Sequence, residues 1–152
     1  MSVVQVSVEI DAPPRTVWNV VANPNNLPRW DRRIASVRGV PPSGLHVGIE
    51  YTTDLRFMGI HARGRARVVE LRPPQYSKVQ VRGLVDGTVE TWLEPLDGGD
   101  RTRLRHRVEY QFIGGPLGRA AARAVNLLGA PALLKRGAQA QKRQAEVEAS
   151  RA

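Results

Sequence analysis

The sequence predicts an α+β domain in which a curved, seven-stranded antiparallel sheet packs on a long C-terminal helix, with two short helices between the first and second strands. Three observations lead to this prediction. Apolar and polar residues alternate at the start of the chain, turn residues recur roughly every ten positions between residues 34 and 112, and residues 116–149 have helical apolar spacing. The length of 152 residues favours one domain, which we place at residues 1–149, followed by a disordered tail at 150–152.

The first strand is expected at residues 3–10, where Val and Ile occupy every second position. Asp11 follows as an expected helix N-cap, and the two prolines after residue 12 suit a first helical turn. Residues 17–21 give this first short helix an apolar face, and Pro24 ends it. The next stretch forms at most one more turn, which carries Trp30. Because a tryptophan in a connector needs apolar cover, we expect it to close or line one end of the core.

Six further strands are expected between Ile34 and Phe112, because turn signals divide this stretch into short strand-like runs. These signals lie at residues 41–44, 58–59, 72–74, 85–87 and 97–100. A glycine pair at 114–115 then marks a change to a helix, whose apolar face is formed by Leu117, Ala121, Ala124, Leu128 and Leu134. Gly129 and Pro131 predict a kink in the middle of that helix.

Composition excludes several classes of site. The chain contains no cysteine, which excludes disulfides, cysteine-based zinc sites and thiol catalysis. It shows no charged and apolar leader and no apolar run of about 18 residues, so we expect a cytoplasmic protein without integral membrane association. His46, His61 and His106 lie far apart, and no phosphate-binding glycine motif occurs. We therefore predict no metal and no cofactor.

The alternation of residues along the strands assigns side chains to two faces of the sheet. The inward set on three strands is Ile49, Tyr51, Thr53, Leu55, Phe57, Ile60, Ala62, Gly64, Ala66, Val68, Leu104, His106, Val108, Tyr110 and Phe112. The small side chains at 62, 64 and 66 leave room and predict a hollow interior. The outward set is rich in arginine, at positions 63, 65, 67, 103, 105 and 107.

The net charge of +9 and the arginine-rich outer face allow two interpretations. One is an anionic partner, either nucleic acid or a membrane surface. The other, which we favour, is an arginine-rich composition and a solvated face on which Glu90, Glu94 and Glu109 pair with some of the arginines. Nucleic acid is an unlikely partner on this interpretation, because only Trp92 could supply an exposed aromatic ring for stacking.

Short motifs along nearly the whole chain resemble one known superfamily. They are the opening strand followed by Asp11-Ala12-Pro13-Pro14 and Val17-Trp18, the segment NPNNLPRW at 23–30, Val47-Gly48, VELRPP at 69–74, Thr102-Arg103-Leu104, and GGPL at 114–117. In this order the sequence resembles the START-like, or SRPBCC, helix-grip superfamily, which includes polyketide cyclases and dehydratases, Bet v 1-like proteins and lipid-transfer domains.

The resemblance implies a cavity between the sheet and the C-terminal helix that binds a hydrophobic or aromatic small molecule, such as a lipid, polyketide or quinone-like compound. We expect a carrier or sensor; the alternatives are a polyketide cyclase, aromatase or dehydratase, and a basic surface module. The candidate ligand-binding residues are Trp30, Tyr51, Thr53, Leu55, Phe57, Ala62, Gly64, Thr91, His106, Val108, Tyr110 and Leu128. For catalysis the candidates are His106, Tyr110 and Tyr51, with His106 suited to acid–base work near neutrality. The chain is expected to be a monomer or a homodimer.

Overall fold

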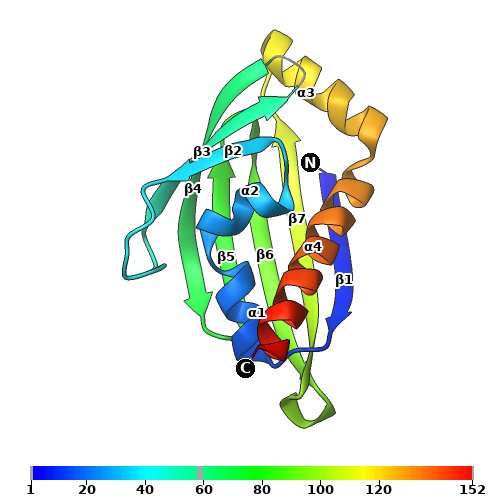
Figure 1. The fold of residues 1–152 in the computed structure, drawn as a ribbon. Helices are drawn as coiled ribbons and strands as arrows, with labels where there is room; N and C mark the ends of the chain where they lie inside the picture. Colours follow the sequence, from blue (N-terminus) through cyan, green and yellow to red (C-terminus); the bar gives the residue numbers. More distant parts are fainter. Residues whose placement is uncertain (1, 58–59, 152) are drawn as a thin grey trace.

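The computed structural model describes residues 2–57 and 60–151, and it contains one antiparallel sheet with helices on its concave face (Figure 1). Seven strands follow the order β1-β7-β6-β5-β4-β3-β2 across this sheet. Their bounds are Ser2–Ile10 (β1), Ile34–Arg38 (β2), Glu50–Phe57 (β3), Ile60–Arg72 (β4), Tyr76–Arg82 (β5), Val85–Leu96 (β6) and Arg101–Phe112 (β7). The predicted fold class is confirmed: six strands follow the two short helices, and a long helix ends the chain. Within the described ranges, no helix is long and apolar enough to cross a membrane.

The two short helical segments connect β1 to β2. Helix α1 spans Pro14–Val21, the 3₁₀ turn η1 spans Pro24–Asn26, and helix α2 spans Leu27–Trp30. Asp11 was expected to cap α1, and this expectation is wrong, because Pro13 occupies the N-cap and no side chain caps the helix. The Asp11 carboxylate instead accepts a hydrogen bond from Arg101 Nε at 2.6 Å. The arginine at the start of β7 is a stronger partner than a backbone amide, since both groups are charged.

The C-terminal helix is divided in two at the predicted kink. Helix α3 spans Gly115–Leu128, and α4 spans Ala130–Ser150. Gly129, with φ of +80°, separates them in a backbone conformation that glycine adopts without steric cost. Pro131 fits the first turn of α4, where its missing N–H is not needed. Only α4 lies across the sheet, where it packs on β1 and α1, while α3 stands off at the far end of β7 (Figure 1).

Strand boundaries differ from the sequence prediction in one hairpin. The turn expected at residues 85–87 lies two residues earlier, at 83–84, and β6 begins at Val85. Gly87 is a strand residue whose Cβ, if present, would collide with the backbone carbonyl of Glu109 on β7. This glycine therefore marks a close approach of two backbones and not a turn. The turn expected at 58–59 lies outside the described residues.

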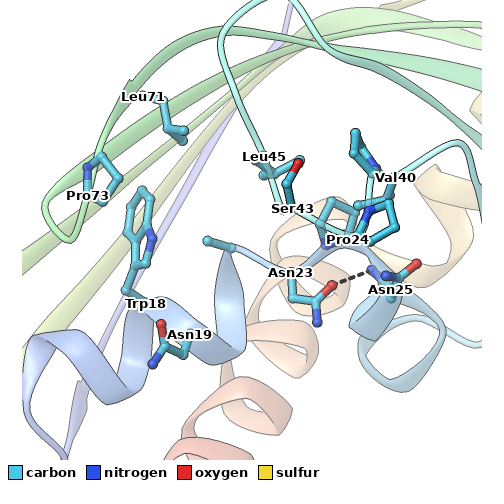
Figure 2. Close-up of a pocket in the computed structure, with 14 residues that line it drawn as sticks. Trp18, Asn19, Asn23, Pro24, Asn25, Val40, Ser43, Leu45, Leu71 and Pro73 are labelled. Carbon is cyan, nitrogen blue, oxygen red and sulfur yellow. Dashed lines mark hydrogen bonds between the residues drawn. The ribbon is translucent and has the colours of Figure 1, made fainter.

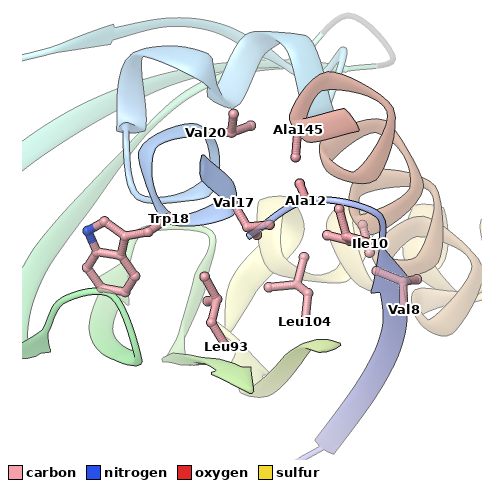
Figure 3. Packing of buried hydrophobic residues seen from close by; sticks show 10 residues of the cluster. Val8, Ile10, Ala12, Val17, Trp18, Val20, Leu93, Leu104 and Ala145 are labelled. Carbon is pink, nitrogen blue, oxygen red and sulfur yellow. The ribbon is translucent and has the colours of Figure 1, made fainter. Parts of the chain in front are cut away.

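Two hydrophobic cores lie on the concave face. The first, which we call the helix-side core, joins β1, β6 and β7 to α1 and α4 and consists of Val8, Ile10, Ala12, Val17, Trp18, Val20, Leu93, Leu104, Ala138 and Ala145 (Figure 3). Ile10 and Leu104 are fully buried in it, and burial of such side chains contributes about 1.5–3 kcal/mol each. The second, the β4-side core, consists of Tyr51, Ala66 and Val68. It is covered by half-buried side chains of α2, β2 and the β2–β3 loop, including Leu27, Val37, Val40 and Leu45.

Candidate functional site

Cross-strand pairing arranges the inward side chains in rows that run across the sheet. One row consists of Tyr51, Ala66, Val81, Gly87 and Tyr110, and the next consists of Val68, Val79, Val89 and Val108. The predicted assignment of faces is confirmed, since Tyr51, Ala66, Val68, Leu104 and His106 are buried and the alternating arginines 63, 65 and 67 are exposed. These rows carry apolar and small side chains, and Gly87 leaves the first row without a side chain on β6.

Part of this concave face is not fully covered. Along β5, β6 and β7 five apolar or aromatic residues are only half-buried, and we call them the inner strip: Val79, Val81, Val89, Val108 and Tyr110. Val79 and Val81 pack against the β4-side core. The strip stays partly exposed because α4 packs mainly on β1 and α2 packs on β2 and α4. Apolar side chains that point inward and still contact solvent form a surface on which an apolar molecule could bury itself.

A cleft of about 640 Å³ opens between the short helices, a loop and the β4–β5 connection (Figure 2). Its walls are α1 with η1 on one side, the β2–β3 loop on another and the β4–β5 connection on the third. The lining residues are Trp18, Asn19, Ala22, Asn23, Pro24, Asn25, Val40, Pro41, Pro42, Ser43, Gly44, Leu45, Leu71 and Pro73. Asparagines and Ser43 supply polar groups at the rim, and Trp18 and Leu71 supply apolar surface. This volume suits a small organic molecule.

Leu71 connects the cleft to the inner face of the sheet. It is half-buried, packs against both the helix-side core and the β4-side core, and lines the cleft. Its cross-strand partner is Ser77, which in turn pairs with Thr91, so Leu71 shares a row with the inward residues of β5 and β6. The cleft therefore lies where the two cores separate, and Leu71 lies at that boundary.

Near the cores a chain of three buried polar side chains joins the sheet to α4. Thr91 Oγ1 lies 2.9 Å from His106 Nδ1, and His106 Nε2 lies 2.7 Å from Gln141 Oε1. Because a glutamine carbonyl oxygen only accepts, Nε2 carries the proton and donates to it, while Nδ1 accepts from the threonine hydroxyl. Burial lowers the pKa of His106, and the hydrogen bond to Gln141 opposes this effect only in part. The imidazole is thus neutral at pH 7, with both nitrogens occupied.

The chemistry of the predicted catalytic residues follows from these surroundings. His106 has no ring nitrogen left for a substrate proton unless the link to Thr91 or Gln141 opens. Burial raises the pKa of Tyr51 to about 12, so its phenol stays protonated near neutrality and can act only as a hydrogen-bond donor or acceptor. Tyr110 is half-buried and packs edge-on against Phe112, with ring centroids 5.7 Å apart. The three predicted side chains share one face of the sheet, but two of them lie on β7 and the third lies on β3, with three strands between.

Other predicted ligand-binding residues are also on the concave face. Thr53 pairs with Gly64 and donates from Oγ1 to its carbonyl at 3.4 Å, and Leu55 pairs with Ala62. Val108 belongs to the inner strip, and Thr91 belongs to the buried polar chain. The side chains of Phe57 and Leu128, which were also predicted, lie outside the described part of the structure. The binding roles of all these residues remain predictions.

Trp30 ends α2 and faces the protein interior. It is half-buried and packs against the helix-side core, as expected for a residue that closes one end of it. Its indole Nε1 is buried and has no hydrogen-bond partner among the described residues.

None of the predicted site residues whose side chains are described lines the cleft. Most of its wall residues come from connectors that the sequence predicts only as turns and helix ends, namely residues 22–25 and 40–45. Their richness in proline and asparagine is the signal that could have pointed to them, since such connectors keep a fixed shape without filling the space beside them.

The comparisons with known proteins agree with this architecture. The chain belongs to the family described as polyketide cyclase / dehydrase and lipid transport, whose model matches residues 1–146. A relative from Mycobacterium tuberculosis (strain H37Rv), the uncharacterized protein Rv1546, is 30% identical over 129 residues, which cover 82% of this chain and 89% of that protein.

Solved structures show the same fold at low identity. TTHA0849 from Thermus thermophilus has a TM-score of 0.74 at 15% identity and covers 96% of this chain and 98% of its own. The Zhui aromatase/cyclase from Streptomyces sp. R1128 has a TM-score of 0.71 at 18% identity, and the match covers 99% of this chain and 94% of that protein. A START superfamily protein from Mycobacterium smegmatis has a TM-score of 0.65 at 16% identity, and the match covers 93% of this chain and 97% of that protein. These likenesses confirm the START-like helix-grip fold.

Proposed function

We propose that this protein binds a hydrophobic or aromatic small molecule on the concave face of its sheet and acts as a carrier or sensor for it. The observation that carries the proposal is the inner strip, a set of inward-facing apolar side chains that the helices leave half-buried. The cleft of about 640 Å³ reaches the inner face at Leu71 and would serve as the entrance, and membership of a lipid-transport and cyclase family supports an apolar ligand.

The driving force would be burial of apolar surface. Removal of apolar area from water contributes about 25 cal/mol for each Å². The buried polar side chains of Thr91, His106 and Gln141 are already hydrogen-bonded to one another. A ligand with a large apolar part and few polar groups fits such a surface best.

A cyclase or dehydratase that acts in the same place is the alternative. It draws support from the family and from the fold shared with an aromatase/cyclase. Proton transfer would require a side chain able to change its protonation state at the substrate. Since His106 is neutral with both nitrogens engaged and the Tyr51 phenol stays protonated, the geometry favours binding over catalysis.

The proposal is tested by blocking the cleft. We would measure binding of an apolar fluorescent probe and retention of lipids by native mass spectrometry for the wild type, Leu71→Trp and the matched control Val3→Trp. Val3 is 46% exposed on the outer face of β1, so an added ring there does not enter the cleft. Leu71→Trp should weaken binding by about tenfold or more, and the control should leave it unchanged.

Two results would contradict the proposal. One is a wild-type protein that retains no apolar molecule and binds no probe. The other is equal weakening by Leu71→Trp and Val3→Trp, which would show binding outside the cleft. Should Leu71→Trp fail to fold, Val108→Phe adds bulk to the inner strip itself and provides the same comparison.

A further inference from the structure

Charge is distributed unevenly over the outer, convex face of the sheet. On the side of β1, β6 and β7 two of the three predicted outward arginines are paired with carboxylates. Arg103 contacts Glu9 at 3.3 Å and Glu94 at 3.5 Å, and Arg107 contacts Glu109 at 3.3 Å and Glu90 at 3.5 Å. The third, Arg105, covers the ring of Trp92. The pairs offset most of the positive charge on that half of the face.

The other half of the convex face carries an excess of positive charge. Its exposed arginines form what we call the arginine patch, which consists of Arg63, Arg65, Arg67 and Arg82 on β4 and β5. Arg65 lies directly opposite Arg82 in the pairing of these strands. Within residues 2–57 and 60–151, no carboxylate lies in ion-pair distance of Arg65, Arg67 or Arg82.

Glu50 lies opposite Arg67 in the strand pairing without an ion pair to it, and in the described structure Asp54 is the one carboxylate in ion-pair distance of the patch. The charge of Asp54 is shared. Its carboxylate lies 3.8 Å from Arg63 Nε and also 3.0 Å from Arg38. Hydrogen bonds from Ser36 and Arg38 hold the pKa of Asp54 below its usual value. Like charges directly opposite on neighbouring strands are destabilising, so an anionic surface that covers Arg65 and Arg82 would relieve repulsion within the patch.

Two exposed apolar side chains border the arginine patch. Val47, on the β2–β3 loop, is 62% exposed, and Val69, at the bulge of β4, is 39% exposed. The backbone next to each valine is joined to that of the other, because Gly48 N–H donates to the Val68 carbonyl at 2.7 Å. Val69 also lies two residues from Arg67 on the same strand. The combination of exposed apolar side chains and unpaired arginines is typical of surfaces that meet the interface of a bilayer.

We propose that the arginine patch, together with Val47 and Val69, docks the protein on an anionic membrane surface. The charge of the patch complements anionic lipid headgroups, and the two valines suit the boundary with the acyl chains. The β2–β3 loop that carries Val47 also forms a wall of the cleft, so docking would place this wall of the cleft at the bilayer. This inference rests on the proposed function, for which the membrane would be the source or destination of the ligand.

A nucleic acid fits this surface less well. Single-stranded nucleic acids stack their bases on exposed aromatic rings between basic residues. Trp92 lies on the convex face but on β6, where Arg105 covers its ring at 5.0 Å. Tyr76 is buried and is covered by Arg72. The arginine patch contains no aromatic residue of its own.

The experiment measures vesicle binding by sedimentation with the full chain and without added ligand. Phosphatidylcholine vesicles are compared with vesicles that contain phosphatidylglycerol, at low and at high salt. The variant Arg65→Gln/Arg67→Gln removes two charges from the patch, and the matched control Arg105→Gln/Arg143→Gln removes two exposed charges elsewhere. A third variant, Val47→Asp, tests the apolar contribution.

The wild type should bind the anionic vesicles and not the neutral ones, and binding should weaken with salt because exposed charges are screened. The patch variant should bind roughly twenty-five-fold more weakly, from a contribution of about fivefold for each of its two arginines. The control should stay close to the wild type, and Val47→Asp should also weaken binding.

Three results would overturn the proposal. The patch and control variants could lose vesicle binding equally, or the wild type could bind neutral and anionic vesicles equally well. The third is displacement of the protein from anionic vesicles by trace RNA. Because no ligand is added, failure here leaves the probe-binding test of the proposed function intact. Conversely, a protein that docks on anionic vesicles but binds no apolar probe would contradict the proposed function alone.

Discussion

Acidification should weaken the fold through His106. In the folded protein this side chain is buried among Thr91, Gln141 and the strands, and burial lowers its pKa below the ordinary value of 6.5. Below pH 6.5 the unfolded chain therefore takes up a proton that the folded chain does not. Stability then falls as pH falls, because the unfolded state binds more protons.

The size of the effect follows from this difference of one proton. While pH lies between the two pKa values, the free energy of unfolding changes by about 1.4 kcal/mol for each pH unit. The loss begins near pH 6.5 and grows by at most this amount per pH unit, until the pH reaches the lower pKa of the folded protein. Asp11 and Asp54 do not contribute in this window, since their pKa values lie below 3.8 and their stabilising contribution is lost only under more acidic conditions.

The assay is urea unfolding at half-unit steps from pH 7.5 to pH 5 for the wild type, His106→Gln and the control His61→Gln. His61 is exposed on β4, so its replacement should keep the wild-type slope. The variant His106→Gln cannot titrate and should lose the slope even if it is less stable overall. A slope that is unchanged in His106→Gln, or an NMR titration of His106 in the folded protein with a pKa at or above 6.5, would refute the reasoning.

Two further substitutions test the packing of the sheet. Thr102→Val should lower the free energy of unfolding, measured in urea, by about 1–3 kcal/mol. Thr102 is fully buried, and its Oγ1 donates to the Ala12 carbonyl at 2.8 Å, so the substitution leaves that carbonyl without this donor. A loss below about 0.5 kcal/mol would mean that another donor replaces it. Gly87→Ala should cost about 3 kcal/mol, since its Cβ collides with the Glu109 carbonyl. Gly114→Ala, whose Cβ meets nothing within 4 Å, is the control, and equal effects of both would contradict the collision.

The sequence was a good guide to the inner face of the sheet and a poor one to the cleft. Tyr51, Ala66 and His106 face inward as predicted, because alternation along a strand follows from local backbone geometry. Two local expectations were wrong, the cap at Asp11 and the turn at 85–87. In each case a contact from a distant strand decided the outcome: the ion pair with Arg101 and the close approach of β7 to Gly87.

The buried polar chain shows the same limit. The position of His106 on the inward face was predicted, but its partner Gln141 lies 35 residues away on α4. The sequence contains no sign that this glutamine would be the one to contact the imidazole, since that depends on the position at which α4 packs along β1. With both nitrogens occupied, the residue with the best pKa for catalysis is the one least free to perform it.

By itself, the sequence determined the order of strands and helices, the two faces of the sheet and the break at Gly129. Each of these depends on residues close together in the chain. Only the tertiary structure decided where the cleft opens and which arginines remain unpaired. The cleft is the space left between α1, the β2–β3 loop and β4. Whether an arginine on one strand meets a carboxylate on the next depends on the register of the two strands. Both are set by long-range packing, which local patterns do not specify.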